Sequence, residues 1–222
     1  RRIVSADSDS NQLRGMAHYI NNPEVSAAIA RGSQDDMTDI HTRTAGIVGV
    51  SRAVAKSLTY ALLFGASDGK LGETAGRKGD GKIIRQLMEG AYEGLKKFTD
   101  TLGYIWEVHY HSGGRGYLYS IAGHKVYCEK YKAFNALLQS FEATVCKEAT
   151  IEAQRRIKAE GLDAKIIAHI HDEANYDVSA NDAPRVAEIL EDCFGSHVTE
   201  KYSLTIPMGG TAVIGKTWAE VH

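Results

Sequence analysis

Two adjacent acidic residues interrupt an apolar β-hairpin in the last third of the chain. Asp172 and Glu173 lie between the apolar stretches Lys165–Ala168 and Tyr176–Val178. Burying a carboxylate without a partner costs free energy, so acids at the tip of such a hairpin call for a bound cation. Hard oxygen ligands suit Mg²⁺. The hairpin therefore predicts a divalent metal site.

A further acid lies far upstream, where residues 2–6 are typical of a short strand that ends at Asp7. Asp7 and Asp172 are 165 positions apart (172 − 7), and only a shared sheet would bring them together. Their convergence would form a two-metal site. Taken alone, each acidic cluster is more often a solvated turn, so the interpretation depends on a third element.

The third element is a segment in which Arg52, Lys56, Tyr60 and Phe64 recur at intervals of four residues. On a helix this spacing places all four side chains along one stripe. Cations at one end suit a polyphosphate, and aromatic rings further along suit a sugar or base. When this segment is considered alone, the better interpretation is a surface helix in which the long cationic side chains cover the aromatic rings.

These three segments resemble motifs A, B and C of the family A DNA polymerases, in the same order, and the match is close to the bacteriophage replicative branch. Motif A of that family reads D-x-S-x-x-E-L-R, motif B reads R-x-x-x-K-x-x-x-[FY]-x-x-x-Y-G, and motif C reads H-D-E. The corresponding residues are Asp7 to Arg14 for motif A, Arg52, Lys56, Tyr60, Phe64 and Gly65 for motif B, and His171, Asp172 and Glu173 for motif C.

Smaller matches extend the resemblance over nearly the whole chain. Residues 39–42 resemble the segment that contributes a phosphate-contacting histidine, here His41. Asn135 and Gln139 match an N-x-x-x-Q helix, and the ending from Gly215 to His222 matches a G-x-x-W segment near a C-terminal histidine.

The resemblance implies template-directed DNA synthesis from primer-template DNA and dNTPs with two Mg²⁺ ions. Asp7 and Asp172 would bind the metal ions, with Glu173 as an auxiliary catalytic acid. Nucleotide binding is implied for six residues, and DNA binding for four. The nucleotide-binding residues would be Gln12, His41, Arg52, Lys56, Tyr60 and Phe64, and the DNA-binding residues would be Arg14, Asn135, Gln139 and His171, the last of which would position the primer terminus.

Two departures from the family pattern bear on nucleotide recognition. Gln12 replaces the Glu that helps exclude a ribose 2′-hydroxyl, so sugar selection is expected to be looser. Phe64 replaces the usual Tyr before Gly65 and removes a hydroxyl near the template base. Single-subunit RNA polymerases usually have Ser in place of Glu173 and Met in place of Tyr60, so these two residues favour DNA synthesis.

The expected fold is α+β, with an antiparallel palm sheet flanked by helices and mostly helical fingers. The expected domains are palm at 1–37, fingers at 38–129 with the motif B helix at about 48–65, and palm again at 130–222 with the motif C hairpin at about 165–178. We expect helices at 12–20, 24–31, 83–102, 135–159 and 184–194, short strands within 103–127, and a last strand at 204–208.

The thumb, the first part of the palm and any exonuclease domain are expected to be absent from this chain. A strand that starts at the terminus would leave a sheet edge exposed, which invites pairing with another chain. A split polymerase with a second polypeptide that supplies the thumb, the remaining palm and an optional exonuclease is the expected arrangement. A processed fragment is the alternative.

The 222 residues are 43% hydrophobic, which is enough for a sizeable core, and carry a net charge of −2. That charge does not by itself indicate a nucleic-acid binder. Three cysteines without C-x-x-C spacing argue against a zinc site or a disulfide framework and fit a reducing compartment. No long apolar run or signal sequence is present, so we expect a cytoplasmic protein that does not bind membranes, here a bacteriophage protein in its host cell.

Two other functions stay open. One is a non-catalytic palm and fingers scaffold that binds DNA or a polymerase partner, but a scaffold has no use for acids placed to hold metal. The other is a metal-dependent nuclease, which would not need the stripe from cations to aromatic rings on the motif B helix.

Overall fold

A computed structural model describes all 222 residues and shows two compact units. The sheet unit contains Arg1–Asn11 and Phe141–His222, and the helical unit contains Gln12–Ser140. The expected α+β class is confirmed. The boundaries of palm and fingers stay a prediction.

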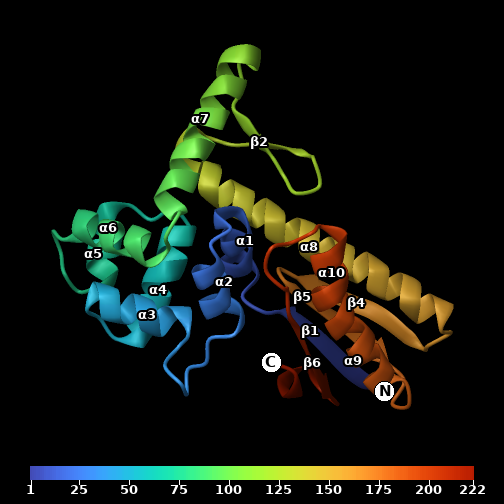
Figure 1. Cartoon of the computed structure of the whole chain (residues 1–222). Coiled ribbons are helices and arrows are strands. Elements are labelled where there is room, and N and C mark those ends of the chain that lie inside the picture. The colour runs from blue at the N-terminus through green and yellow to red at the C-terminus, as the bar shows by residue number, and fades with distance from the viewer. The chain divides into compact units, whose positions relative to one another are not determined.

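The sheet unit is built on four strands in the order β4-β5-β1-β6 (Figure 1). Their bounds are β1 (Arg2–Ser8), β4 (Ala164–Ile170), β5 (Glu173–Val178) and β6 (Gly210–Gly215). β1 pairs antiparallel with both β5 and β6, and β4 pairs antiparallel with β5. The expectation of an exposed edge at β1 is therefore wrong, because β1 is an inner strand and the edges are β4 and β6.

Alternation along the strands gives the sheet two different faces. Val4 and Ala6 of β1, with Ala174 and Tyr176 of β5, are fully buried on one face. Helix α9 (Ala183–Asp192) contacts β1 and β6. Asp7 and Glu173 belong to the other set of alternating positions, so the sheet presents its acids on the face opposite to this core.

Helix α8 (Ala133–Ala159) begins in the helical unit and continues into the sheet unit. It spans the predicted helix and ends two residues before Gly161, whose φ is +67°. Within the sheet unit, Glu148 of α8 binds His197 and Lys201, and Arg156 binds Asp192. These partners lie in α9, in the π-helical turn η2 (Cys193–His197) and in α10 (Val198–Lys201).

The last strand was predicted at the wrong position. The chain from Leu204 to Met208 forms no strand, and β6 begins only at Gly210. Ile206 and Met208 are buried there without pairing in the sheet, and the backbone amide of Met208 donates to the Thr199 hydroxyl at 2.8 Å. The apolar residues that suggested a strand therefore fill the core from a loop.

The helical unit contains α1 to α7 and a small hairpin (Figure 1). Its core gathers large apolar side chains from α1 through α7, among them Leu13, Leu58, Ile84 and Tyr92, all almost completely buried. The helices are α1 (Asn11–Ile20), α2 (Pro23–Ala30), α3 (Ile40–Val48), α4 (Arg52–Leu63), α5 (Asp68–Thr74), α6 (Gly81–Ala91) and α7 (Leu95–Gly113).

Two predictions in this unit need correction. The single helix expected at 83–102 is two helices, because the backbone turns at Tyr92 and then at Gly94, where φ is +96°. α7 also continues to Gly113, well into the region expected to hold strands. The strands there are β2 (Tyr117–Tyr119) and β3 (Lys125–Tyr127), which form the hairpin and lead to the 3-10 turn η1 (Lys130–Lys132).

No helix has both the length and the apolar character needed to cross a membrane.

Candidate active site

The sheet unit brings the predicted acids together. Asp7 of β1 is the direct cross-strand partner of Glu173 at the start of β5. Asp172 occupies the turn just before β5, and its carbonyl accepts a 3.1 Å hydrogen bond from the backbone amide of Ser8. The register of one antiparallel pair therefore places three carboxylates at the same end of the sheet, as the sequence predicted.

The carboxylates affect each other electrostatically. Partial desolvation, together with the negative charges of Asp172 and Glu173, raises the pKa of Asp7 from 3.8 to about 6. Desolvation is the largest cause of this shift, and the two neighbouring negative charges add to it. A cation bound between Asp7 and Asp172 would remove this cost.

Glu173 is already occupied by donors from its own unit. Its carboxylate accepts from the Ser5 hydroxyl at 2.5 Å and from the Asn175 amide at 2.7 Å. His222 Nε2 lies 2.8 Å from one carboxylate oxygen and 3.0 Å from the other. The His222 ring also stacks on Trp218 with centroids 4.2 Å apart. These contacts fix the position of the Glu173 carboxylate.

Sequence reasoning missed Ser5 and Asn175 as partners of Glu173. Strand alternation places positions 5 and 7 on one face of β1 and positions 173 and 175 on one face of β5, but only the register of the two strands shows that these faces coincide.

No group of three or more His, Cys, Asp or Glu side chains is arranged to hold a metal ion. The donor set still fits Mg²⁺, because this ion usually keeps several waters and takes only one or two protein carboxylates together with substrate phosphates. Asp7 and Asp172 would supply those two carboxylates.

The thiol of Cys146 is a second feature that the sequence did not reveal. Cys146 of α8 is fully buried and accepts a hydrogen bond from the Asn11 side chain, with Nδ2 and Sγ 3.1 Å apart. Burial and the negative charge of Asp172 raise the pKa of this thiol. Cys146 is therefore a protonated packing residue near the acids.

His171 lies in the two-residue turn between β4 and β5. Its φ is +55°, in the left-handed region that glycine tolerates best, and its side chain is exposed. A histidine therefore occupies a strained backbone position next to Asp172, where glycine would fit without strain.

The motif B stripe forms in the helical unit. Arg52, Lys56 and Tyr60 lie on α4, and Phe64 caps its end. The Tyr60 ring centroid is 6.4 Å from that of Phe64 and 6.3 Å from that of His41. The predicted nucleotide-binding residues other than Gln12 therefore group on α4 and at the start of α3.

Arg52 and Lys56 have different surroundings. Arg52 forms a two-point ion pair with Asp39, at 3.1 Å and 3.2 Å. Asp39 also caps α3 by accepting from the amides of His41 and Thr42. Burial alone would raise the pKa of Asp39, but the hydrogen bonds from Thr42 and Arg52 outweigh it and hold that pKa at about 2. Lys56 is exposed and has no acidic partner.

His41 is a buried residue at the start of α3. Its side chain is 8% exposed, and its Nδ1 lies 3.5 Å from the hydroxyl of Thr59. Burial lowers its pKa, and the cationic Arg52 and Lys56 lower it further against the opposing effect of Asp39. These effects together favour the neutral imidazole.

Four other predicted residues also lie in the helical unit. Gln12 and Arg14 are partly buried on α1, and Gln139 is exposed on α8. Asn135 donates from Nδ2 to the carbonyl of Leu63 at 3.2 Å, so it satisfies one of the last carbonyls of α4.

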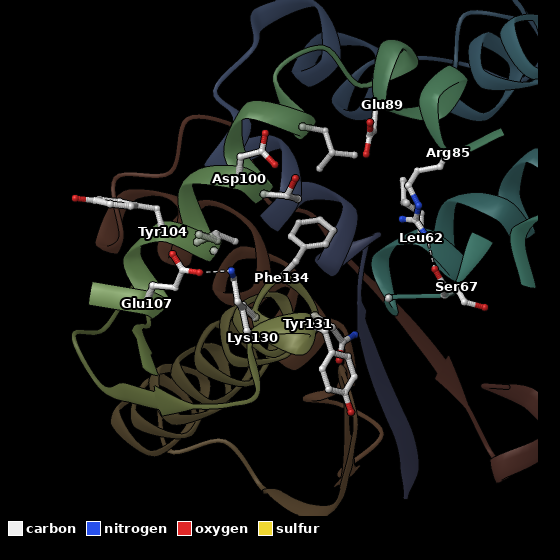
Figure 2. A pocket seen from close by; sticks show the side chains of 18 residues that line it. Leu62, Ser67, Arg85, Glu89, Asp100, Tyr104, Glu107, Lys130, Tyr131 and Phe134 are labelled. Atoms are coloured by element: carbon white, nitrogen blue, oxygen red, sulfur yellow. Dashed lines mark hydrogen bonds and ion pairs between the residues drawn. The ribbon is translucent and has the colours of Figure 1, made fainter. Parts of the chain in front are cut away.

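A cavity of about 890 Å³ opens in the same unit beside the end of α4. Leu62, Phe134 and Asn135 are among its lining residues, and Figure 2 shows the Lys130–Glu107 ion pair on its rim. The charged residues that line it are two cations, Arg85 and Lys130, and three acids, Glu89, Asp100 and Glu107. This balance does not favour a phosphate backbone.

These features define an α+β protein with three acids at one end of an antiparallel sheet and, in its other unit, a helix that carries two cations. The family model for DNA polymerase family A matches residues 1–220, and the chain belongs to that family. It is 25% identical to a DNA-directed DNA polymerase of Escherichia phage Phieco32, over 99% of this chain and 40% of the relative. It is 24% identical to DNA polymerase I of Chloroflexus aurantiacus, over 99% of this chain and 24% of the relative.

The fold agrees with a solved structure described as the POL domain of Pol1 from M. smegmatis in complex with DNA primer-template and dNTP. The TM-score is 0.79 at 20% identity, over 100% of this chain and 40% of that chain. This chain thus spans 40% or less of these relatives, and the expected polymerase fold is confirmed.

Proposed function

We propose that this chain carries the catalytic residues for template-directed DNA synthesis, in which dNTPs are added to a primer 3′-hydroxyl with release of pyrophosphate. The observation that carries the proposal is the grouping of Asp7, Asp172 and Glu173 at one end of the sheet, with the pKa of Asp7 raised to about 6. The family match and the solved relative, whose description includes primer-template DNA and dNTP, support it.

Asp7 and Asp172 would hold two Mg²⁺ ions. The ions would lower the pKa of the primer hydroxyl and offset charge on the triphosphate, as in other two-metal sites. The side chains provide fixed negative charge and leave the remaining ligand positions to phosphate, hydroxyl and water oxygens. Glu173 acts as a positioning residue, because Ser5, Asn175 and His222 occupy its carboxylate.

The cationic end of α4 would bind the triphosphate. Lys56 is free of acidic partners, and Arg52 is oriented by Asp39. A charged phosphate beside His41 favours its protonated form, so this imidazole would add a third positive group. Cations held in place stabilise the negative charge that moves onto pyrophosphate in the transition state. Interactions that are stronger in the transition state than in the ground state accelerate the reaction.

Tyr60 and Phe64 would contact the sugar and base of the nucleotide, with Gln12 contributing to sugar selection. Arg14, Asn135, Gln139 and His171 would contact the primer-template. Asn135 donates one amide hydrogen to the Leu63 carbonyl, so its second amide hydrogen and its oxygen are left for DNA. An exposed His171 at a strained turn suits the placement of a primer terminus.

The proposal includes a second polypeptide that supplies the thumb and the remaining palm. The two edge strands support it. Ile166, Ile167 and Ile170 of β4, with Val213 and Ile214 of β6, are each at least 40% exposed. Apolar edge strands pair readily with other chains. The pairing of β4 with β5 is interrupted by a bulge at Ile167.

The test compares Mg²⁺-dependent incorporation on a primed template for three purified forms of the chain, together with any polypeptide that co-purifies. Asp172→Asn is expected to abolish incorporation, whereas Glu173→Gln is expected to reduce it by a smaller factor. Equal activity in the native and Asp172→Asn forms would favour the alternative, a non-catalytic scaffold, and place catalysis in another chain.

A further inference from the structure

The hairpin formed by β2 and β3 has one aromatic face. Its register pairs Tyr117 with Tyr127 and Tyr119 with Lys125, so these four side chains share a face. Leu118 points the opposite way, is 2% exposed and packs with Leu102, Ala133 and Leu137. The apolar face thus anchors the hairpin in the helical unit and leaves the aromatic face for another purpose.

The rings on this face form a stack that continues onto α7, beside which the hairpin lies (Figure 1). The His109 ring lies flat on Tyr117, with centroids 4.0 Å apart and an angle of 1°. Its Nδ1 donates to the Tyr117 carbonyl at 2.7 Å. Tyr119 meets Tyr117 edge to face at 5.4 Å. These contacts hold the rings rigid, although Tyr119 is 52% and Tyr127 50% exposed.

Packing of the hairpin explains Tyr117 but not its exposed neighbours. Leu118 and Tyr117 hold this short hairpin against α7. The exposed rings of Tyr119 and Tyr127 bury little apolar area and therefore add little to stability. A large apolar area that stays exposed to solvent on a rigid hairpin is typical of a surface that binds another molecule.

Cations interleave with the rings. The Arg115 guanidinium lies 4.5 Å from the Tyr127 ring centroid, and Lys125 Nζ lies 4.6 Å from that of Tyr117. Neither forms an ion pair with an acid. By contrast, the nearby Lys130 and Lys132 are paired with Glu107 and Glu129. Two unpaired positive charges therefore lie among the exposed rings.

An open cavity of about 460 Å³ adjoins this face and is lined by Trp106, Tyr110, Arg115 and Tyr127, among others. Trp106 donates from its indole to the Cys128 carbonyl at 2.8 Å and stacks on Tyr110 at 5.0 Å. A side chain at Gly116 would collide with the Trp106 ring, so this position requires glycine. The cavity adds two further rings to the surface.

We propose that this aromatic hairpin surface binds single-stranded DNA. Exposed rings offer stacking positions to bases of any sequence, and unpaired cations beside them bind the phosphates between those bases. A duplex hides its base faces, so the surface fits an unpaired strand. The identification of that strand as unpaired template rests on the proposed function, but the binding itself does not.

The experiment measures the binding of a fluorescein-labelled oligothymidine of about 16 nucleotides to the full chain by anisotropy, without Mg²⁺ or dNTP, over a range of salt concentrations. The double substitution Tyr119→Ala and Tyr127→Ala is expected to weaken binding about tenfold or more, since one stacked base is worth roughly 1–3 kcal/mol. Tyr119→Phe with Tyr127→Phe keeps the rings and is expected to retain native affinity.

Replacing both Arg115 and Lys125 with Gln is expected to weaken binding and to make it less sensitive to salt. The slope of log affinity against log salt concentration should fall in magnitude by about 1.4, or about 0.7 for each phosphate that is no longer neutralised. Lys97→Gln is the matched control, because Lys97 is exposed on the same helix as His109 without a ring contact, and it should leave affinity unchanged. Thermal unfolding of each variant checks its fold.

Unchanged affinity in the alanine and glutamine variants would overturn the inference, as would equal weakening in the Phe variant or no binding of the native chain at low salt. If the variants lose a co-purifying polypeptide but keep their affinity for DNA, the surface binds a protein partner, and the inference is overturned. Asp172→Asn is expected to bind the oligonucleotide normally, so failure of the proposed catalysis and failure of this inference are separable.

Discussion

Asp7 on β1 and Glu173 on β5 are direct cross-strand partners, and Asp172 immediately precedes Glu173. Like charges that face each other across a strand pair destabilise a sheet. The sheet therefore carries a local electrostatic cost where the metal ions are proposed to bind, and this cost has measurable consequences.

Asp172→Asn is expected to stabilise the metal-free chain at pH 7. Because the pKa of Asp7 is about 6 in the folded chain and ordinarily 3.8, the native state binds more protons between these values. The free energy of unfolding contributed by Asp7 therefore falls as pH rises through that window. Removing the charge of Asp172 should raise the free energy of unfolding by about 1 kcal/mol after solvent screening, which corresponds to an increase of about 2–4 °C in Tm.

Thermal unfolding from pH 4 to 8 tests this prediction. The native chain should gain stability on addition of Mg²⁺, and the Asp172→Asn chain should gain little. Asp36→Asn, in an exposed loop of the helical unit, is the control and should behave like the native chain. A lower Tm for Asp172→Asn without metal would contradict the prediction.

Asp39→Asn is expected to destabilise the chain at neutral pH. The pKa of Asp39 is about 2, below its ordinary 3.8, so its ionised form stabilises the native state above about pH 4. That contribution is lost as pH falls toward 2. Asn keeps the cap on α3 but loses the ion pair with Arg52.

Urea unfolding should show Asp39→Asn about 1–2 kcal/mol less stable than the native chain at pH 7, with the difference almost gone near pH 2. A difference that does not depend on pH would show that packing, and not charge, accounts for the effect.

Tyr60→Phe is expected to increase discrimination against dideoxynucleotides. On the family resemblance, the Tyr60 hydroxyl substitutes for the missing 3′-hydroxyl of a chain terminator, and α4 holds this ring between Phe64 and His41. The measurement is the ratio of dideoxy to deoxy incorporation for both forms. No rise in discrimination after removal of the hydroxyl would refute the assignment.

His171→Gly is expected to reduce primer extension with little change in stability. Glycine relieves the positive φ of this turn, worth about 1 kcal/mol, but adds a similar entropic cost to folding. Urea unfolding and steady-state extension measured together separate the two effects. Equal extension by both forms would remove His171 from the site, and His171→Asn, which also tolerates this backbone, is the matched comparison.

Much of the site was predictable because its signals are local. The spacing of Arg52, Lys56 and Tyr60 is the period of a helix, and the apolar residues around Asp172 follow the pattern of a hairpin. The strand at residues 204–208 was wrong because an apolar stretch does not reveal whether its backbone pairs or fills a core from a loop. The break near Tyr92 was missed because α6 and α7 each continue a helical pattern.

The sequence by itself determined the fold class, most of the helices, the family and the identity of the acids and cations, because these depend on residue type and short-range periodicity. Only the tertiary structure decided that β1 is an inner strand, that Ser5, Asn175 and His222 hold Glu173, and that Asp39 engages Arg52. Of the side-chain contacts, the one between Ser5 and Glu173 joins residues 168 positions apart. Strand order and side-chain partners at such separations follow from packing of the whole chain, which no local pattern encodes.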